Sequence, residues 1–337
     1  MRKIVEIGER RVIDIILGVL DVMPGMPIPF GDDASAIEMG DGRLAVLKTD
    51  MLVGKTDVPP GMGFREAARK AVVMNISDMA AKGVKPEAIL VSLGLPPEVT
   101  SNDVKLIGEG LNMGAREYDT YVIGGDTNEA SDLVISCSVL GFCDGEKFIR
   151  RDGARPGDIV AATGFFGRTA LGLRVLLDGL SIPQDVRSSV LEAVLMPKAR
   201  LKEGLALAET GAITSSIDSS DGLAWSLHEV ADASGVGFII EDIPIAPEVK
   251  EIAEGCGLDP VELSLYGGEE YELILTVKPE LWDEVKRVME EIGTPLTTMG
   301  RVIEERRLVL KVDGRIEPIE RRGWEHFRSP PSRTINS

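Results

Sequence analysis

Aspartates with small or hydroxyl-bearing neighbours recur along the chain, and their carboxylates could hold a metal ion. Asp33, Asp50, Asp126 and Asp218 lie at the ends of predicted strands, and Asp78 lies on a predicted helix. Sites in α/β proteins gather at strand ends, so these side chains could converge. Acids that meet without histidine or cysteine form an all-oxygen site, which suits Mg²⁺. The pattern favours phosphoryl transfer, although solvated acids at separate strand ends are the alternative.

Residues 31–50 suggest how two of these acids could meet. The pair Asp41-Gly42 is a strong signal for a tight hairpin turn between two mostly apolar runs. With that turn, Asp33 faces Asp50 at the open end of the hairpin. Two carboxylates at ~4 Å repel by about 4 kcal/mol at an effective dielectric constant near 20. A divalent cation between them would remove this repulsion; otherwise the two side chains splay into water.

A helix predicted over residues 64–82 could deliver a further acid. Good helix formers dominate it, and Asn75 and Asp78 lie three residues apart on one face. Small residues on the same face would permit close packing around a carboxylate. A solvated acid on a helix surface is the alternative.

Two later strands end in residues that could contact a ligand. A strand predicted over 120–123 is followed by Gly124-Gly125-Asp126-Thr127, where glycines would let a ligand approach the backbone. A strand over 212–217 leads into Asp218 and then a predicted helix. Ser220 and Asp221 could simply cap that helix, but capping leaves Asp218 unexplained.

The order of predicted elements indicates a two-domain α/β (α+β) protein. Residues 1–150 contain the hairpin, the 64–82 helix and further strands, and form the first domain. Residues 151–328 form a C-terminal α/β domain, and 329–337 form a tail. A length of 337 residues agrees with two domains.

Composition excludes several classes of function. The net charge of −18 argues against nucleic acid or an anionic membrane as the main partner. No apolar run is long enough to cross a bilayer, and three scattered cysteines indicate reduced thiols. We expect a soluble, cytoplasmic protein that binds neither nucleic acid nor membrane.

Two familiar nucleotide-binding motifs fail on their spacing. Gly54-Lys55-Thr56 resembles the end of a P-loop, but Thr49 stands where its first glycine belongs. The glycines at 164 and 167 follow a strand, yet the dinucleotide-binding spacing is absent. The glycines at 164 and 167 would instead permit close backbone packing, or one phosphate at the N-terminus of the helix that follows.

Six motifs taken together resemble the thiamine-monophosphate kinases of the aminoimidazole ribonucleotide synthase superfamily. They occur in the family's order and span most of the chain. They are Gly31-Asp32-Asp33-Ala34, Thr49-Asp50-Met51-Leu52-Val53, Asn75-Ile76-Ser77-Asp78-Met79-Ala80-Ala81, Gly124-Gly125-Asp126-Thr127, Ile217-Asp218-Ser219-Ser220-Asp221-Gly222-Leu223 and Gly267-Gly268-Glu269-Glu270-Tyr271-Glu272-Leu273. Each motif is weak alone, but the set is highly specific.

The resemblance implies direct transfer of the γ-phosphoryl group of ATP to thiamine monophosphate on several Mg²⁺ ions. It also implies a homodimer whose N-terminal sheets join in a barrel, with each site in a cleft between the two domains. By motif position the metal ligands would be Asp33, Thr49, Asp50, Asp78, Asp126, Asp218 and Asp221, with Asp50, Asp126 and Asp218 central to catalysis. Gly125, Asp126, Arg151 and Ser220 would contact ATP, and Glu269 and Trp324 would contact the thiamine portion.

Two positions depart from the family pattern. Lys48 stands where a metal-binding hydroxyl is common, so its charge could replace one metal ion. Asp57 stands where a substrate-binding histidine is usual, and an acid there could attract the cationic thiazolium ring.

The nearest rivals share the fold. Selenophosphate synthetase has a reactive residue in its N-terminal segment, but the first cysteine here is Cys137. The hydrogenase-maturation relative ends in a cysteine, but here the last residue is Ser337. Two alternatives remain. The protein could be an ATP-dependent enzyme of the same fold that acts on another small phosphorylated or carbonyl substrate, or it could bind nucleotide and metal without catalysis.

Overall fold

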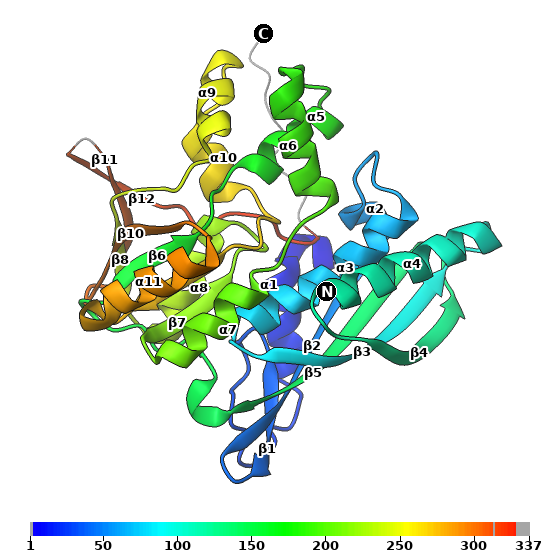
Figure 1. The fold of residues 1–337 in the computed structure, drawn as a ribbon, viewed down its shortest axis with the longest axis horizontal. Coiled ribbons are helices and arrows are strands. Elements are labelled where there is room, and N and C mark those ends of the chain that lie inside the picture. The colour runs from blue at the N-terminus through cyan, green and yellow to red at the C-terminus, as the bar shows by residue number, and fades with distance from the viewer. Residues whose placement is uncertain (1–2, 313, 328–337) are drawn as a thin grey trace.

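The computed structural model describes residues 3–312 and 314–327, and two β-sheets dominate it (Figure 1). The N-terminal elements are α1 (Ile4–Leu17), β1 (Ser35–Gly40), β2 (Arg43–Val53), α2 (Gly54–Asp57), α3 (Phe64–Ala81), β3 (Lys85–Leu95), α4 (Ser101–Glu117), β4 (Val122–Glu129), β5 (Val134–Asp144) and η1 (Gly145–Lys147). The strand order of the first sheet is β1-β2-β5-β3-β4, with only β3 and β4 parallel.

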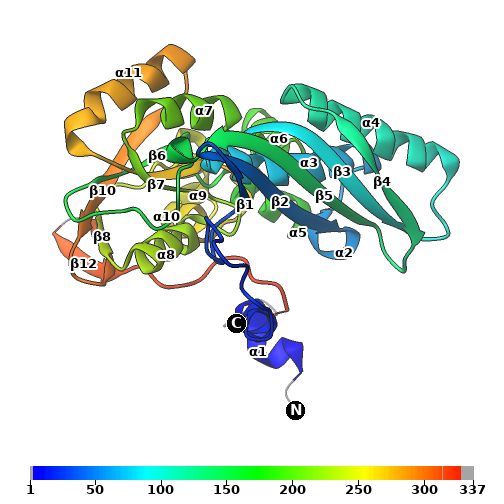
Figure 2. The same cartoon turned by 90° about the horizontal axis from the view of Figure 1, so that it is seen from below.

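The two faces of this first sheet differ. Helices α3 and α4 cover one face (Figure 2). The other face exposes large apolar side chains, among them Leu47, Met51 and Leu90. Strands β1 and β4 form its two edges, so the sheet of a single chain is open and a barrel would need a second copy.

The C-terminal elements build a seven-stranded sheet between helices. They are β6 (Ile159–Thr163), α5 (Arg168–Leu177), α6 (Gln184–Leu195), α7 (Leu201–Thr210), β7 (Ile213–Asp218), α8 (Leu223–Ser234), β8 (Gly237–Ile240), α9 (Pro247–Gly255), α10 (Pro260–Tyr266), β9 (Leu273–Val277), η2 (Pro279–Leu281), α11 (Trp282–Ile292), β10 (Leu296–Ile303), β11 (Leu308–Val312) and β12 (Arg315–Pro318). The order is β12-β11-β8-β10-β6-β9-β7, with α7 and α11 on one face and α8 on the other (Figure 2).

Helix α3 joins the two halves. Its small residues, such as Ala68, Ala71 and Ala80, are buried and let neighbouring elements pack closely around it. One apolar cluster extends from β2 and β5 through α3 to β9 and α11. Helix α3 therefore holds its polar side chains at the junction of both halves, as its position in Figure 1 shows.

The hairpin register differs by one residue from the prediction. Ile37 pairs with Ala45, and the register shifts between Glu38 and Gly40. A β-bulge places two residues of one strand opposite one residue of the other, and the sequence gives no clear signal for it. Pairing ends at Ser35, so Asp33 does not face Asp50 across paired strands as predicted.

Another local prediction is wrong, because Gly124-Gly125-Asp126-Thr127 lies within β4 rather than after it. The alternative of capping by Ser220 and Asp221 also fails. Gly222 occupies the capping position of α8, with no side-chain cap bond.

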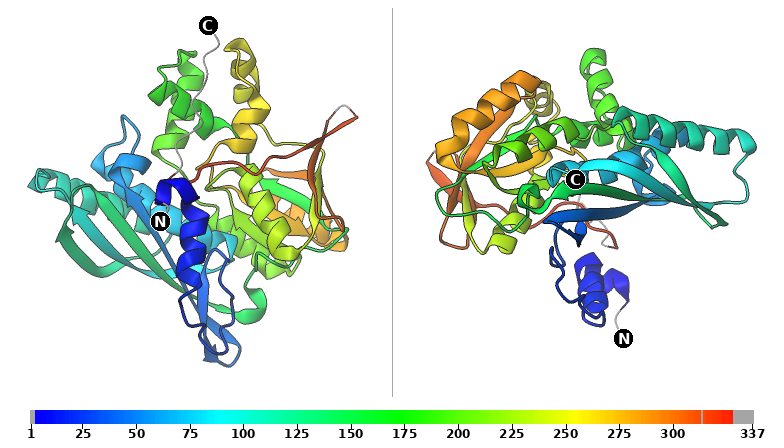
Figure 3. Two further views of the ribbon diagram at one scale, coloured as in Figure 1. Left: turned by 180° about the vertical axis from the view of Figure 1, so that it is seen from behind. Right: turned by 60° about the horizontal axis from the view of Figure 1, so that its bottom comes forward.

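Helix α1 stands apart from both sheets, and the C-terminal segment reaches it (Figures 2 and 3). No helix in the described part of the chain is both long and apolar enough to cross a membrane. The predicted tail, 329–337, lies outside the described residues.

Candidate active site

Three buried aspartates converge at the junction of the two halves. Asp33 precedes β1, Asp78 belongs to α3, and Asp218 is the last residue of β7. Each offers one carboxylate oxygen, and these oxygens lie within 4.8 Å of one another. All three side chains are buried, at 8%, 7% and 3% exposure, so water does little to screen their repulsion.

A lysine lies between this cluster and a fourth acid. Lys48 and Asp50 point to the α3 side of β2, because alternate residues of a strand share a face. The ammonium nitrogen of Lys48 lies 3.1 Å from Oδ1 of Asp50 and 2.9 Å from Oδ2 of Asp78. Asn75 accepts a hydrogen bond from the backbone N–H of Asp50 at 2.9 Å. Asp50 is thereby tied to the cluster through Lys48 and α3.

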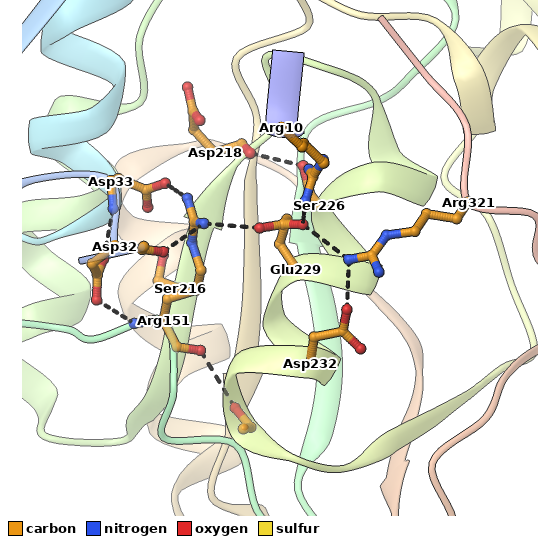
Figure 4. Close-up of polar contacts among 12 residues, drawn as sticks. Arg10, Asp32, Asp33, Arg151, Ser216, Asp218, Ser226, Glu229, Asp232 and Arg321 are labelled. Carbon is orange, nitrogen blue, oxygen red and sulfur yellow. Dashed lines mark hydrogen bonds and ion pairs between the residues drawn. The ribbon is translucent and has the colours of Figure 1, made fainter. Parts of the chain in front are cut away.

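Two further cations hold Asp33. Lys82 is fully buried, and its Nζ lies 2.8 Å from Oδ2 of Asp33 and 2.7 Å from Oδ1 of Asp32. The guanidinium of Arg151 also pairs with Asp33, and it reaches Glu229 on its other side (Figure 4). These contacts place Asp33 between the acid cluster and a group of basic side chains.

The protonation of these acids follows from their partners. Burial alone would raise the pKa of Asp33, but the charges of Arg151 and Lys82 hold that pKa well below its usual range. Burial raises the pKa of Asp78 against the opposing charge of Lys48, and the nearby charges of Asp50 and Asp218 add to the rise. Burial and the charge of Asp33 raise the pKa of Asp218 to about 7, against a hydrogen bond from Ser77. The excess of acid is an electrostatic cost that a divalent cation would offset.

A cavity of about 510 Å³ lies beside the cluster. Side chains of both signs line it, with Arg10 and Arg151 among the bases and Glu9 and Asp221 among the acids. Two tryptophans, Trp225 and Trp324, supply aromatic surface. Burial raises the pKa of Asp221 to about 7, and the nearby charge of Glu9 adds to the shift. The cavity is therefore suited to a ligand that carries both charges and a ring.

Family models match both halves of the chain: the N-terminal domain of AIR synthase related proteins over residues 31–143, and the C-terminal domain over 155–313. A thiamine-monophosphate kinase of Pyrococcus abyssi is 39% identical over 299 residues, which are 88% of this chain and 90% of that protein. One of Pyrococcus horikoshii is 38% identical over 300 residues, covering 88% and 91%. This chain belongs to the thiamine-monophosphate kinase family. A solved structure, "AaThiL complexed with AMPPCP and TMP", matches with a TM-score of 0.84 and 29% identity, covering 97% of this chain and 99% of that one.

Two metal ligands that the family resemblance implies lie away from the buried cluster. Thr49 points to the opposite face of β2 from Asp50, and its hydroxyl donates to the carbonyl of Cys137 at 3.0 Å. Asp126 is exposed on β4, and the pairing across β3 and β5 places it in line with the exposed Met51 of β2. Three strand spacings separate β4 from β2, so Asp126 lies roughly 14 Å from β2. Within one chain the structure therefore does not bring these two residues to Asp33, Asp78 and Asp218.

Strand packing alone explains why residue 125 is a glycine. A Cβ at this position would lie 1.8 Å from the carbonyl oxygen of Val91, so only glycine lets β4 approach β3 here. Contact with ATP stays a prediction for this family member.

Asp57 and Glu269, two predicted acceptor contacts, meet through a lysine that the sequence interpretation missed. The buried Lys70 of α3 donates to the carbonyl of Asp57 at 2.9 Å and pairs with the carboxylate of Glu269. Glu269 has a φ of +65°, a conformation that costs energy for a side chain other than glycine and often marks a functional site. Ser220 supports the same loop, because its carbonyl accepts from the N–H of Glu269 at 2.6 Å.

Lys70 and Lys82 gave no signal in the sequence. Lysines on helices are usually solvated, and Lys70 lies within α3 while Lys82 directly follows it. Only the packing of α3 against both halves of this family member buries them.

Proposed function

We propose that this chain transfers the γ-phosphoryl group of ATP to thiamine monophosphate and releases ADP and thiamine diphosphate. The observation that carries the proposal is the set of three buried carboxylates from both halves, in a chain 39% identical to a thiamine-monophosphate kinase. Phosphoryl transfer depends on charge stabilisation and alignment more than on a covalent nucleophile, and such a site supplies both.

The donor set fits Mg²⁺. Asp33, Asp78 and Asp218 offer only oxygen atoms, close enough together to share hard divalent ions. Bound Mg²⁺ would neutralise phosphate charge and hold the phosphates in line. The ligands that the resemblance implies are Asp33, Thr49, Asp50, Asp78, Asp126, Asp218 and Asp221. Because Thr49 and Asp126 lie away from the buried cluster within one chain, their part in holding metal stays a prediction. We infer catalytic importance for Asp50, Asp126 and Asp218.

The chain's own groups would position both substrates. Arg151 carries a guanidinium, which suits a phosphate of ATP, and we infer that Gly125, Asp126 and Ser220 also contact the nucleotide. Trp324 is 49% exposed and lines the cavity, so we infer that its ring stacks on thiamine. Asp57 and Glu269 offer carboxylates for the cationic thiazolium. Lys70 positions both residues, through the backbone carbonyl of Asp57 and the carboxylate of Glu269.

We infer a homodimer formed through the open face of the first sheet. That face exposes Leu47, Met51 and Leu90, and a second copy would bury them. Residues 1–150 and 151–328 are the proposed domain limits. The three cysteines are free, which agrees with a cytoplasmic location.

The test is ADP release by purified protein with Mg²⁺ and ATP, with and without thiamine monophosphate. We expect release that requires the acceptor, together with thiamine diphosphate in equal amount. Tight ATP binding without turnover would instead favour a non-catalytic binder. If the protein phosphorylates only another phosphate monoester in a panel of acceptors, that compound would replace thiamine monophosphate as the proposed acceptor.

A further inference from the structure

The N-terminal helix and the C-terminal segment are clasped by a reciprocal pair of hydrogen bonds. The backbone N–H of Glu9 donates to Oε1 of Glu325 at 3.2 Å, and the backbone N–H of His326 donates to Oε2 of Glu9 at 3.0 Å. The partners are more than 300 residues apart in sequence. Two bonds in opposite directions fix both the position and the direction of the C-terminal segment on α1.

A kink at Gly8 makes this clasp possible. Gly8 has a φ of +76° and a ψ of 170° inside α1, a conformation that glycine adopts without a steric cost. In an uninterrupted helix the N–H of Glu9 would donate to the carbonyl of Val5. The kink breaks that pattern and turns the N–H of Glu9 toward Glu325 instead.

The clasp borders Trp324, which is also held from its other side. The N–H of Trp324 donates to the carbonyl of Asp221 at 3.0 Å. Gly323 permits this approach, because a Cβ there would lie 2.2 Å from the same carbonyl oxygen. The ring of His326 meets the indole edge-on, with ring centres 5.9 Å apart. Asp221 and Glu9 thus fix the backbone on both sides of an indole that is half exposed.

The same cavity contains Glu9, Asp221, Trp324 and Glu325 among its lining residues. An aromatic face with carboxylates around it attracts an organic cation, by charge and by the cation–π interaction. Thiamine monophosphate carries a cationic thiazolium ring at one end and a phosphate at the other. Arg10 and Arg151 line the cavity too and could receive the anionic end.

We propose that Glu9 is a positioning residue for the acceptor: by holding the 325–326 segment it fixes the indole of Trp324 so that the thiazolium ring can stack on it. The inference rests on the proposed function and deepens it. It assigns α1, which lies outside the matched domain models, to the acceptor site.

The test compares Glu9→Ala with Glu6→Ala. Glu6 is an exposed acid of the same helix whose carboxylate accepts from the backbone N–H of Lys3. We expect Glu9→Ala to raise KM for thiamine monophosphate about tenfold, the equivalent of about 1.4 kcal/mol. Its kcat and its KM for ATP should stay within about twofold of wild type, as expected when only acceptor binding is lost. Glu6→Ala should match wild type, and Glu9→Gln, which keeps an acceptor for His326, should recover part of the loss.

Amide hydrogen exchange gives a readout that does not depend on activity. Residues 324–327 should exchange faster in Glu9→Ala than in wild type, while α3 stays unchanged. An equal rise in KM for ATP, or unchanged exchange at 324–327, would overturn the role of Glu9. Wild-type protein without acceptor-dependent ADP release would instead overturn the proposed function, and the two failures are therefore separable.

Discussion

The ammonium nitrogen of Lys48 lies 2.9 Å from Oδ2 of Asp78, and the same nitrogen reaches Oδ1 of Asp50 at 3.1 Å. The lysine side chain is only 16% exposed, so this positive charge sits between two acids where little water screens it. The ammonium charge offsets the repulsion between the two carboxylates. Lys48 therefore stabilises the site before any metal arrives.

Replacing Lys48 tests this idea. Lys48→Ser should lower the free energy of unfolding without metal by about 3 kcal/mol, because it leaves buried acids without a partner. Excess Mg²⁺ should restore more stability to the variant than to wild type, measured by urea unfolding with and without the ion. Lys55→Ser, at an exposed position in α2, is the matched control. Equal stability of Lys48→Ser and wild type without Mg²⁺ would show that the ion pairs contribute nothing.

Asp50→Asn should reduce kcat about 100-fold or more while the fold survives, a loss typical for removal of one electrostatic group from an active site. The change removes a negative charge and almost no volume. Steady-state kinetics with circular dichroism would measure both effects. Asp41→Asn, in the exposed hairpin turn, is the control. A wild-type kcat in Asp50→Asn would count against a role for this carboxylate in holding metal.

The sequence predicted the convergence of Asp33, Asp78 and Asp218 because each lies beside a readable element. Helix spacing predicts the face on which Asp78 lies, and the end of a predicted strand locates Asp218. Because sites in α/β proteins form where strands end, acids from both halves are expected to meet, and these three do. The order of elements, read from apolar runs and glycines, also predicted most helices and strands of both sheets.

Other features could not be predicted, because they depend on contacts between distant segments. A bulge near Met39 moved the hairpin register by one residue, and a local pattern rarely reveals a bulge. Lys70 and Lys82 are buried only because α3 is enclosed by both halves. The clasp between Glu9 and His326 joins segments that are far apart in the sequence, so no local sequence pattern indicates it.

Trp324→Ala should raise KM for thiamine monophosphate roughly tenfold and KM for ATP much less, because a stacked aromatic ring contributes on the order of 1 kcal/mol. Trp324→Phe keeps an aromatic face and should retain most of the affinity. Initial rates with each substrate varied in turn would measure the two constants. A larger rise in KM for ATP than in KM for thiamine monophosphate would indicate that Trp324 contacts the nucleotide rather than the acceptor.

The open face of the first sheet gives a last prediction, on assembly. Leu90→Asp should shift the protein from dimer to single chain in sedimentation experiments, because Leu90 is 51% exposed on the face that we propose a second copy covers. A charge buried in an apolar interface without a partner is strongly unfavourable. Leu177→Asp places the same charge on an equally apolar but remote residue of α5, which is 61% exposed, and should leave the dimer intact. If wild-type protein sediments as a single chain, or if Leu90→Asp sediments as the same dimer, this face is not the interface.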